Sequence, residues 1–359
     1  QAYGKPAEAP ENDWSGRVAV VQCDGGRVQI RDECWGQEKS VDKKHRWWRE
    51  SQCGVLQTYL SQPSVEDPHP DVPEALKDPL WVVPKLNEIH RQHGDTHGSE
   101  TPSVEEDTLT STPDDSDSPF DASPPNGDNS TEDHPRWSSG EPLVKTVIAT
   151  RRGYEHLGLA MATEAYHRGF NEAASKAFMG DGLKVNWSLW GRYFSHYVPI
   201  TDLMHALSYV YCAAVACGLR MEDGWSLYLQ WLDWVWTGQV TRVIDAMKSI
   251  ASRCEHPVEA LDRAITYLSN NAERMNYVQY RCRGLPITTS LVESTQKQIN
   301  SRIKGTEKFW QDEHLEPLLQ LVADDLSDNH DRDAFWERRH QRYNGFRQRR
   351  RDKPKSQKN

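Results

Sequence analysis

The chain has 359 residues, and 36% of them are hydrophobic, which is enough for one large domain or two ordinary ones around a packed core. The formal net charge is −10, but residues 61–140 hold 18 Asp and Glu against 4 Lys and Arg, whereas residues 338–359 hold ten Lys and Arg against Asp352 alone. The longest nearly uncharged apolar run, Ala206–Leu219, is shorter than the roughly 20 residues of a membrane-spanning helix, so we expect no membrane partner.

Cysteine usage and the first residues both indicate a reducing compartment. The seven cysteines are an odd number without a Cys-x-x-Cys pair, which disfavours structural zinc. Gln1–Lys5 has neither an initiator Met nor the apolar core of a signal peptide. We therefore expect a cytoplasmic protein whose chain begins inside a longer one.

The first ordered region is expected at residues 14–62, with three strands. Val18–Val21 is a continuous apolar run typical of a buried strand, and Cys23–Gly26 has the composition of a tight turn. Arg27–Arg31 then alternates polar and apolar residues with the period of a second strand, and Gly54–Leu60 is a candidate third. This region is the first part of the predicted core.

Residues 63–142 are rich in Asp, Glu, Ser, Thr and Pro, a composition that cannot bury much apolar surface. We expect an acidic and largely disordered linker. Order returns in residues 143–217, the second part of the core. The expected elements are a strand at Leu143–Ile148, a helix at Tyr154–Ser175, a strand at Ala177–Met179 leading to Asp181, a strand at Tyr197–Thr201 and a helix from an Asp202 N-cap to Cys217.

Residues 218–285 are helical in pattern throughout and hold closely spaced tryptophans, which indicates an all-helical insertion. Residues 286–335 contain a final amphipathic helix at Ser290–Ile303 and further helices, and residues 336–359 form a basic tail. The order of three strands, a helix, two strands and a helix predicts an α/β protein with a ribonuclease H-like core.

Three acidic residues stand where such a core can bring them together. Asp24 and Asp181 follow strands, and Glu293 lies on the last amphipathic helix. Cleavage of a phosphodiester without a covalent intermediate uses two hard cations, and Mg²⁺ prefers carboxylate oxygens. Each residue alone has an ordinary alternative, because Asp before Gly is common in turns and Glu293 with Lys297 is a common helix pair.

The surroundings of these residues resemble the ISKra family of insertion-sequence transposases, and the matching stretches follow in the same order. The stretches are Cys23–Val28, Glu164–Gly169, Gly180–Gly182, Ile200–Ala206 and Tyr280–Ile287. Ser290–Lys297, followed by Arg302–Gly305, is similar to the helix that bears the family's catalytic Glu.

The resemblance implies a DDE transposase that cuts and rejoins double-stranded DNA at element ends and target. Asp24, Asp181 and Glu293 would be catalytic and would hold two Mg²⁺ or Mn²⁺ ions, on a ribonuclease H-like core with an all-helical insertion before the Glu. The implied protein is a homo-oligomer on DNA, associated with the nucleoid, and takes no small-molecule substrate. Related transposases carry an N-terminal region that recognises element ends, whereas this chain starts just before its first strand.

Asp202 and His205 match the Asp-x-x-His pair that follows the second Asp in this and related transposase groups, so we assign them an accessory role. The alternatives are a helix N-cap with a first-turn His, or a direct role in positioning DNA. A further alternative makes Asp202 the second metal ligand instead of Asp181.

Two basic segments are candidates for binding DNA phosphates. Lys297, Asn300 and Lys304 follow Glu293 at i+4, i+7 and i+11, on one face of a continuous helix. The tail carries Arg349, Arg350 and Arg351. The alternatives are a solubilising stripe and a solvated tail.

Trp231 and Trp234 are expected to belong to a helical core rather than to stack on bases. Besides an active transposase, the sequence leaves open a catalytically silent DNA-binding protein and a nuclease that hydrolyses strands without transfer.

Overall fold

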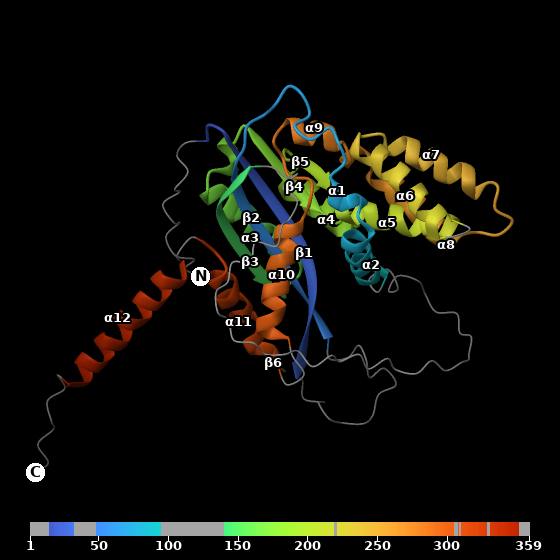
Figure 1. Ribbon diagram of the computed structural model, residues 1–359. Coiled ribbons are helices and arrows are strands. Elements are labelled where there is room, and N and C mark those ends of the chain that lie inside the picture. The colour runs from blue at the N-terminus through green and yellow to red at the C-terminus, as the bar shows by residue number, and fades with distance from the viewer. Residues whose placement is uncertain are drawn as a thin grey trace, which may run out of the picture.

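The computed structural model describes residues 14–31, 48–94, 140–218, 221–304, 308, 310–328 and 331–351. Within them the protein is mixed α/β, with one sheet covered by helices (Figure 1). The strands are β1 (Arg17–Arg31), β2 (Trp48–Leu60), β3 (Glu141–Thr150), β4 (Ser175–Gly180), β5 (Val198–Thr201) and β6 (Trp310–Gln311). The helices are α1 (Glu74–Lys77), α2 (Pro79–Gly94), α3 (Tyr154–His167), α4 (Lys184–Tyr193), α5 (Leu203–Cys217), α6 (Met221–Trp236), α7 (Val240–Ala251), α8 (Glu259–Asn271), α9 (Tyr277–Cys282), α10 (Ser290–Ile303), α11 (Asp312–Asp325) and α12 (Asp331–Arg351).

The sheet has the order β3-β2-β1-β4-β5, and β6 adds a short pairing with β1. β1 runs antiparallel to β2, and β2 antiparallel to β3. β4 is parallel to β1 and to β5, and α4 makes the crossover between β4 and β5. This arrangement is compatible with the ribonuclease H-like core that the sequence led us to expect.

The expected turn at Cys23–Gly26 is wrong, because β1 is one continuous strand of 15 residues. Gly25 pairs with Gln52 and Gly26 with Ser51 in the ladder with β2. The glycines serve close packing instead of a turn: a Cβ on Gly25 would lie 2.9 Å from the Tyr154 hydroxyl, and one on Gly26 would overlap the Gln296 side chain.

The third strand is consequently placed differently from the prediction. The expected strand at Gly54–Leu60 is the end of β2, so the described part of residues 14–62 holds two strands. The third strand along the chain is β3, which begins at Glu141, after the acidic region.

The start of the expected linker is folded. Residues 63–94 include α1 and α2, and their Leu76, Val82 and Leu86 side chains are fully buried against the core that includes α5. The prediction failed here because the average composition is acidic, although these apolar residues recur at the spacing of a helix. Residues 95–139, which carry the rest of the disorder prediction, lie outside the described residues.

The second part of the core follows the prediction in outline. β3, β4 and β5 lie within or next to the expected ranges, and α5 ends at Cys217 as expected. The helix expected at Tyr154–Ser175 is shorter: α3 ends at His167, and Gly169 follows in the left-handed region with a φ of 70°. The sequence reading missed α4.

Side chains of β1 pack into separate cores on the two faces of the sheet, as the alternation of a strand requires. Val18 and Val20 contact the core shared with α2, α5 and the helices from α6 to α9. Ala19 and Val21 contact the core under α3 and α4. A third core joins the far end of β1 to α10 and α11.

We call residues Met221–Cys282 the helical unit, since they form α6, α7, α8 and α9 beside the sheet (Figure 1). Trp231 is fully buried there, as expected of a core residue. Trp234 is partly buried and packs against the Arg242 guanidinium, whose carbon lies 4.1 Å from the ring centroid.

The last helices include the candidate Glu. α10 has the expected bounds and packs against β1 and β2, while α12 extends away from the rest of the molecule (Figure 1). Among the described residues, every helix is too short or too polar to cross a membrane.

Candidate metal centre

The parallel pairing of β1 and β4 brings Asp24 and Asp181 to neighbouring positions. The last paired residues of the two strands are Gln22 and Met179, and each Asp stands two residues beyond its own member of that pair. Both aspartates are partly buried. The sheet therefore places two carboxylates together, as the sequence predicted.

The charge around Asp24 is not neutralised. Burial and the negative charges of Asp181 and Glu293 raise the pKa of the Asp24 carboxyl, His205 and the Gly25 N–H lower it, and the result is a pKa of about 7. The Gly25 N–H donates to Asp24 Oδ1 at 2.7 Å. Such a site favours binding of either a proton or a cation.

The turn after β4 fixes Asp181. Asp181 Oδ1 accepts hydrogen bonds from the Leu183 N–H at 2.9 Å and from Asn186 Nδ2 at 2.7 Å. The buried Asn186 also accepts a hydrogen bond from Cys23 Sγ at 3.3 Å. Asn186 thus connects Asp181 to the residue beside Asp24.

α10 brings Glu293 to the same place from a segment far along the chain. The Val292 N–H donates to Gln22 Oε1 at 3.1 Å, which ties the first turn of the helix to β1. Thr289 Oγ1 donates to Glu293 Oε1 at 2.9 Å. Burial raises the pKa of Glu293, although its side chain keeps 30% of its exposure and can reach a ligand.

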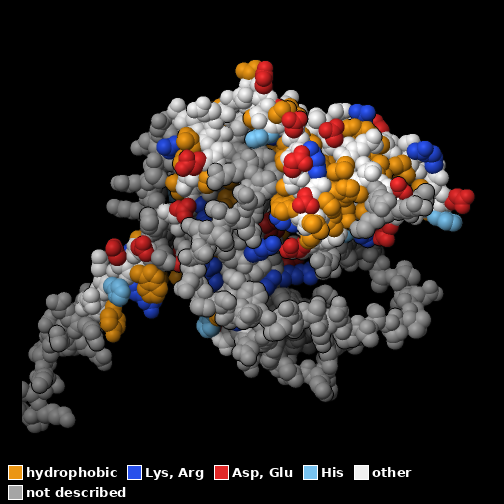
Figure 2. All heavy atoms as spheres, viewed as in Figure 1, with side chains coloured by type: hydrophobic (Ala, Val, Ile, Leu, Met, Phe, Trp, Pro, Cys, Tyr) orange, Lys and Arg blue, Asp and Glu red, His pale blue; other side chains and the backbone are white. Residues whose placement is uncertain are grey.

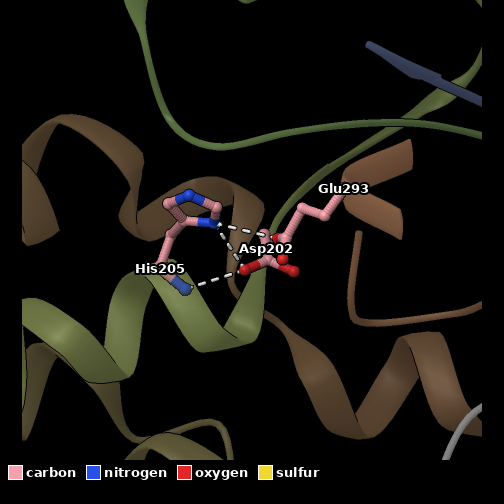
Figure 3. A group of neighbouring side chains, drawn as sticks. All are labelled: Asp202, His205 and Glu293. Carbon is pink, nitrogen blue, oxygen red and sulfur yellow. Dashed lines mark hydrogen bonds and ion pairs between the residues drawn. The ribbon is translucent and has the colours of Figure 1, made fainter. Parts of the chain in front are cut away.

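Asp202 is the N-cap of α5, as the sequence predicted, and it also holds α10. Its Oδ2 accepts from the His205 N–H and contacts His205 Nδ1, each at 2.7 Å. Its Oδ1 accepts from the Thr289 N–H at 2.5 Å. Asp202 is fully buried, and Figure 3 shows it between His205 and Glu293.

The surroundings of His205 favour its protonated form. Burial by itself lowers the pKa of the imidazole, but the hydrogen bond and charge of Asp202 and the charges of Glu293 and Asp181 raise it to about 10. Burial likewise raises the pKa of Asp202, and the bonds from His205 outweigh this and lower it. Asp202 and His205 are therefore an internal ion pair.

Among the described residues, one group of acidic and histidine side chains has ligand atoms close enough together to hold a metal ion. Ligand atoms of Asp202, His205 and Glu293 lie within 4.8 Å of one another, and His205 Nδ1 is 3.9 Å from Glu293 Oε1. Both Asp202 oxygens already accept hydrogen bonds, however, and a cation there would replace them. The predicted set of Asp24, Asp181 and Glu293 does not form such a close group, although the charges of Asp181 and Glu293 act on the partly buried Asp24. Carboxylate oxygens are the ligands that Mg²⁺ prefers.

The basic residues predicted on α10 have different surroundings. Lys297 Nζ lies 3.2 Å from Glu88 Oε1 of α2, and Figure 2 shows basic and acidic side chains next to one another between α10 and α2. Asn300 Oδ1 accepts from Gln296 Nε2 at 3.2 Å. Lys304 is partly buried: burial and the charge of Arg27 lower its pKa, while Asp24 raises it.

Two of the predicted basic residues thus act electrostatically on the carboxylates: Lys304 interacts with Asp24, and Lys297 lowers the pKa of Glu293. Arg27, which was not predicted, lies close enough to Lys304 to lower its pKa. Arg349, Arg350 and Arg351 belong to the last turn of α12, but their side chains lie outside the described residues.

Sequence reasoning missed the residues that orient the carboxylates. Asn186 and Thr289 donate hydrogen bonds to Asp181 and Glu293, and Gln22 accepts from the Val292 N–H beside Glu293. Thr289 had a local signal, since it directly precedes a helix and stands four residues before Glu293. Gln22 and Asn186 had none.

Comparison with protein-family models gives no match, and no curated protein matches the chain.

Proposed function

We propose that this protein is a metal-dependent polynucleotidyl transferase built on a ribonuclease H-like core with a helical insertion before Glu293. More specifically, we propose a DDE transposase similar to the ISKra family, which cleaves insertion-sequence ends and transfers the strand to target DNA. The convergence of Asp24, Asp181 and Glu293, with a carboxyl pKa near 7 at Asp24, is the observation that carries the proposal.

Each residue of the centre has a role in this proposal. Two Mg²⁺ or Mn²⁺ ions, when bound, activate the attacking oxygen and stabilise the leaving one. Asp24, Asp181 and Glu293 hold them. Thr289 orients the Glu293 carboxylate, and Asp202 holds Thr289.

DNA phosphates require positive charge close to the carboxylates. The residues that supply it are His205 of α5, Arg27 of β1 and Lys304, the extended residue that follows the end of α10 instead of continuing the helix as predicted. Lys297, Asn300 and the arginines of α12 extend the contact to double-stranded DNA outside the centre. We propose that the protein acts as a homo-oligomer on DNA associated with the nucleoid.

The test is a cleavage and joining assay with Mg²⁺, on DNA carrying the sequences that flank the gene. Asp24→Asn, Asp181→Asn and Glu293→Gln are each expected to reduce cleavage by more than about 100-fold, because losing a ligand costs more than losing a residue that only orients one. DNA binding by these variants should stay within about 2-fold of the wild type, since none of the three donates to a phosphate.

Asp245→Asn is the matched control, because Asp245 is an exposed acidic residue of α7 in the helical unit. Full cleavage by any one of the three variants removes that residue from the metal set. Hydrolysis without joining identifies a nuclease, and DNA binding without any product identifies a catalytically silent DNA-binding protein.

A further inference from the structure

We infer that the helical unit completes the metal centre, with Tyr267 of α8 as a positioning residue for Asp181. This inference rests on the proposed role of Asp181 as a metal ligand. Tyr267 and Asp181 are 86 residues apart in sequence, and the Tyr267 hydroxyl donates to the Asp181 backbone carbonyl at 2.7 Å.

Two backbone carbonyls of the turn after β4 accept hydrogen bonds from the same helix. Tyr267 binds the carbonyl of Asp181, and Asn271, one helical turn later, donates from Nδ2 to the carbonyl of Gly182 at 3.5 Å. Asn271 Oδ1 in turn accepts from Trp187 Nε1 of α4 at 2.8 Å. α8 is therefore bound to both sides of the turn that carries Asp181.

Gly182 shows how closely α8 approaches this turn. Its φ is 96°, a conformation that favours glycine, and a Cβ there would lie 2.6 Å from the Tyr267 ring. The Tyr267 ring therefore lies directly against the backbone of the turn at Gly182. A larger residue at 182 would have to move Tyr267 away.

α8 is packed against the core on both sides of Tyr267. The Tyr267 ring stacks on Tyr209 of α5, with centroids 4.0 Å apart and an interplanar angle of 12°. Ala264 and Leu268, on either side of Tyr267, are fully buried. Tyr267 is therefore packed against α5, the helix that begins at Asp202.

The side chain and the backbone of Asp181 are held by different parts of the molecule. Leu183 and Asn186 bind the carboxylate, whereas Tyr267 binds the carbonyl. β4 ends at Gly180, so the sheet does not extend to Asp181. Without the Tyr267 hydroxyl, the carboxylate keeps its partners, but the turn keeps only the longer bond from Asn271 to the Gly182 carbonyl as a hydrogen bond to α8.

The test compares Tyr267→Phe with Tyr228→Phe in the full chain. Both changes remove one buried tyrosine hydroxyl of the helical unit, but Tyr228 donates to the Leu76 carbonyl of α1 at 3.3 Å and not to the Asp181 turn. Phe at 267 retains the ring and its stacking on Tyr209. The measurements are Mn²⁺ binding by calorimetry and amide hydrogen exchange of residues 181–183 without metal.

We expect Tyr267→Phe to raise the Kd for Mn²⁺ about 10-fold, as for other residues that orient a ligand, and to accelerate exchange at residues 181–183. Its cleavage rate should recover at high Mg²⁺, since the ligands themselves remain. Tyr228→Phe should match the wild type in both measurements.

Wild-type Mn²⁺ affinity and wild-type exchange in Tyr267→Phe overturn the inference. If Tyr267→Phe melts well below Tyr228→Phe, Gly182→Ala tests the same contact from the turn, with the same expected loss of Mn²⁺ affinity. A wild-type protein that binds no Mn²⁺ refutes the proposed function, and hydrogen exchange still decides whether Tyr267 holds the turn.

Discussion

The Asp24 carboxyl is subject to burial and to two neighbouring carboxylates, and all three act in the same direction. They raise its pKa from 3.8 to about 7. A proton and a metal ion therefore compete for this oxygen pair near neutral pH, because only the ionised form is a good ligand.

The metal-free protein should lose stability as the pH rises from 5 to 8. A carboxyl whose pKa is raised by folding contributes stability that is fully present below 3.8 and is lost as the pH rises through about 7. Melting temperature against pH, with and without Mn²⁺, measures this. Mn²⁺ should restore stability at pH 8 and have little effect at pH 5.

Asp24→Asn is the control, since the amide resembles the protonated acid and does not ionise. It should flatten the pH dependence between 5 and 8 and remove the effect of Mn²⁺. An equal pH dependence in this variant and the wild type would mean that Asp24 is not the titrating group.

Asp202 has two structural roles, of which the sequence predicted the first. Asp202 caps α5, and it also fixes the start of α10 through the Thr289 N–H. Both Asp202 oxygens accept hydrogen bonds, and Asp181 Oδ1 accepts two as well, so the choice between Asp181 and Asp202 as the second ligand stays a prediction. The position of Thr289 against Asp202 could not be read from spacing, since they are 87 residues apart.

Among the secondary-structure elements, the bounds of α10 were predicted correctly and those of β1 were not. The bounds of α10 were predicted correctly because its apolar positions recur at helical spacing up to Ile303. β1 was divided in two because Gly25-Gly26 has the composition of a turn, whereas its close contacts with Tyr154 and Gln296 come from distant segments. Local composition does not reveal such contacts.

The ion pair between α2 and α10 has a consequence for DNA binding. Lys297 and Glu88 keep 65% and 46% of their side-chain exposure, so the pair contributes little to stability. Glu88 nevertheless forms an ion pair with Lys297, which lies on the same helix as Glu293. The acidic region thus reduces the positive charge available on α10.

Glu88→Gln should therefore strengthen DNA binding, and Lys297→Ala should weaken it without changing the melting temperature. Loss of one phosphate contact is expected to reduce the slope of log affinity against log salt by about 1. Fluorescence anisotropy of a labelled duplex between low and moderate salt measures both. Glu74→Gln, in the exposed pair with Lys77 on α1, is the control.

If Lys297→Ala leaves the slope of log affinity against log salt unchanged, Lys297 makes no phosphate contact and belongs to a solubilising stripe. A weaker affinity of Glu88→Gln for DNA would contradict the expectation that Glu88 opposes DNA binding.

At the scale of the whole molecule, residues 63–94 connect parts that are distant in sequence. α2 packs against α5, and Asp67 binds Arg281 of α9 through two hydrogen bonds, of which Arg281 Nε to Asp67 Oδ1 is 2.9 Å. The Arg281 side chain retains 2% of its exposure and that of Asp67 13%. The segment expected to be a linker is part of the core.

Asp67→Asn should destabilise the protein by about 3 kcal/mol at pH 7, because it leaves the Arg281 charge buried without its partner. Burial alone raises the pKa of Asp67, but the hydrogen bonds and charges of Arg281 and His69 together outweigh it and lower the pKa. The contribution of the pair is therefore present above 3.8 and is lost as the pH falls through the lowered value. Urea unfolding at pH 7 and at low pH measures both effects.

The exposed pair of Arg263 and Glu259 on α8 provides a comparison, and Glu259→Gln should change stability by less than about 1 kcal/mol. A similarly small change in Asp67→Asn would show that the 63–73 segment is not held to α9 by this pair.

The sequence by itself determined the apolar strand of β1, the bounds of α10, the Asp202 cap and the three carboxylates selected for the centre. These depend on periodicity and on neighbours within a few residues. Only the tertiary structure decided that β1 continues through Gly25-Gly26, that residues 63–94 fold, and that the start of α10 is bound to Gln22 and Asp202 and the Asp181 turn to Tyr267. Those outcomes depend on contacts between residues far apart in the chain, whose register is set by the packing of the sheet against its helices.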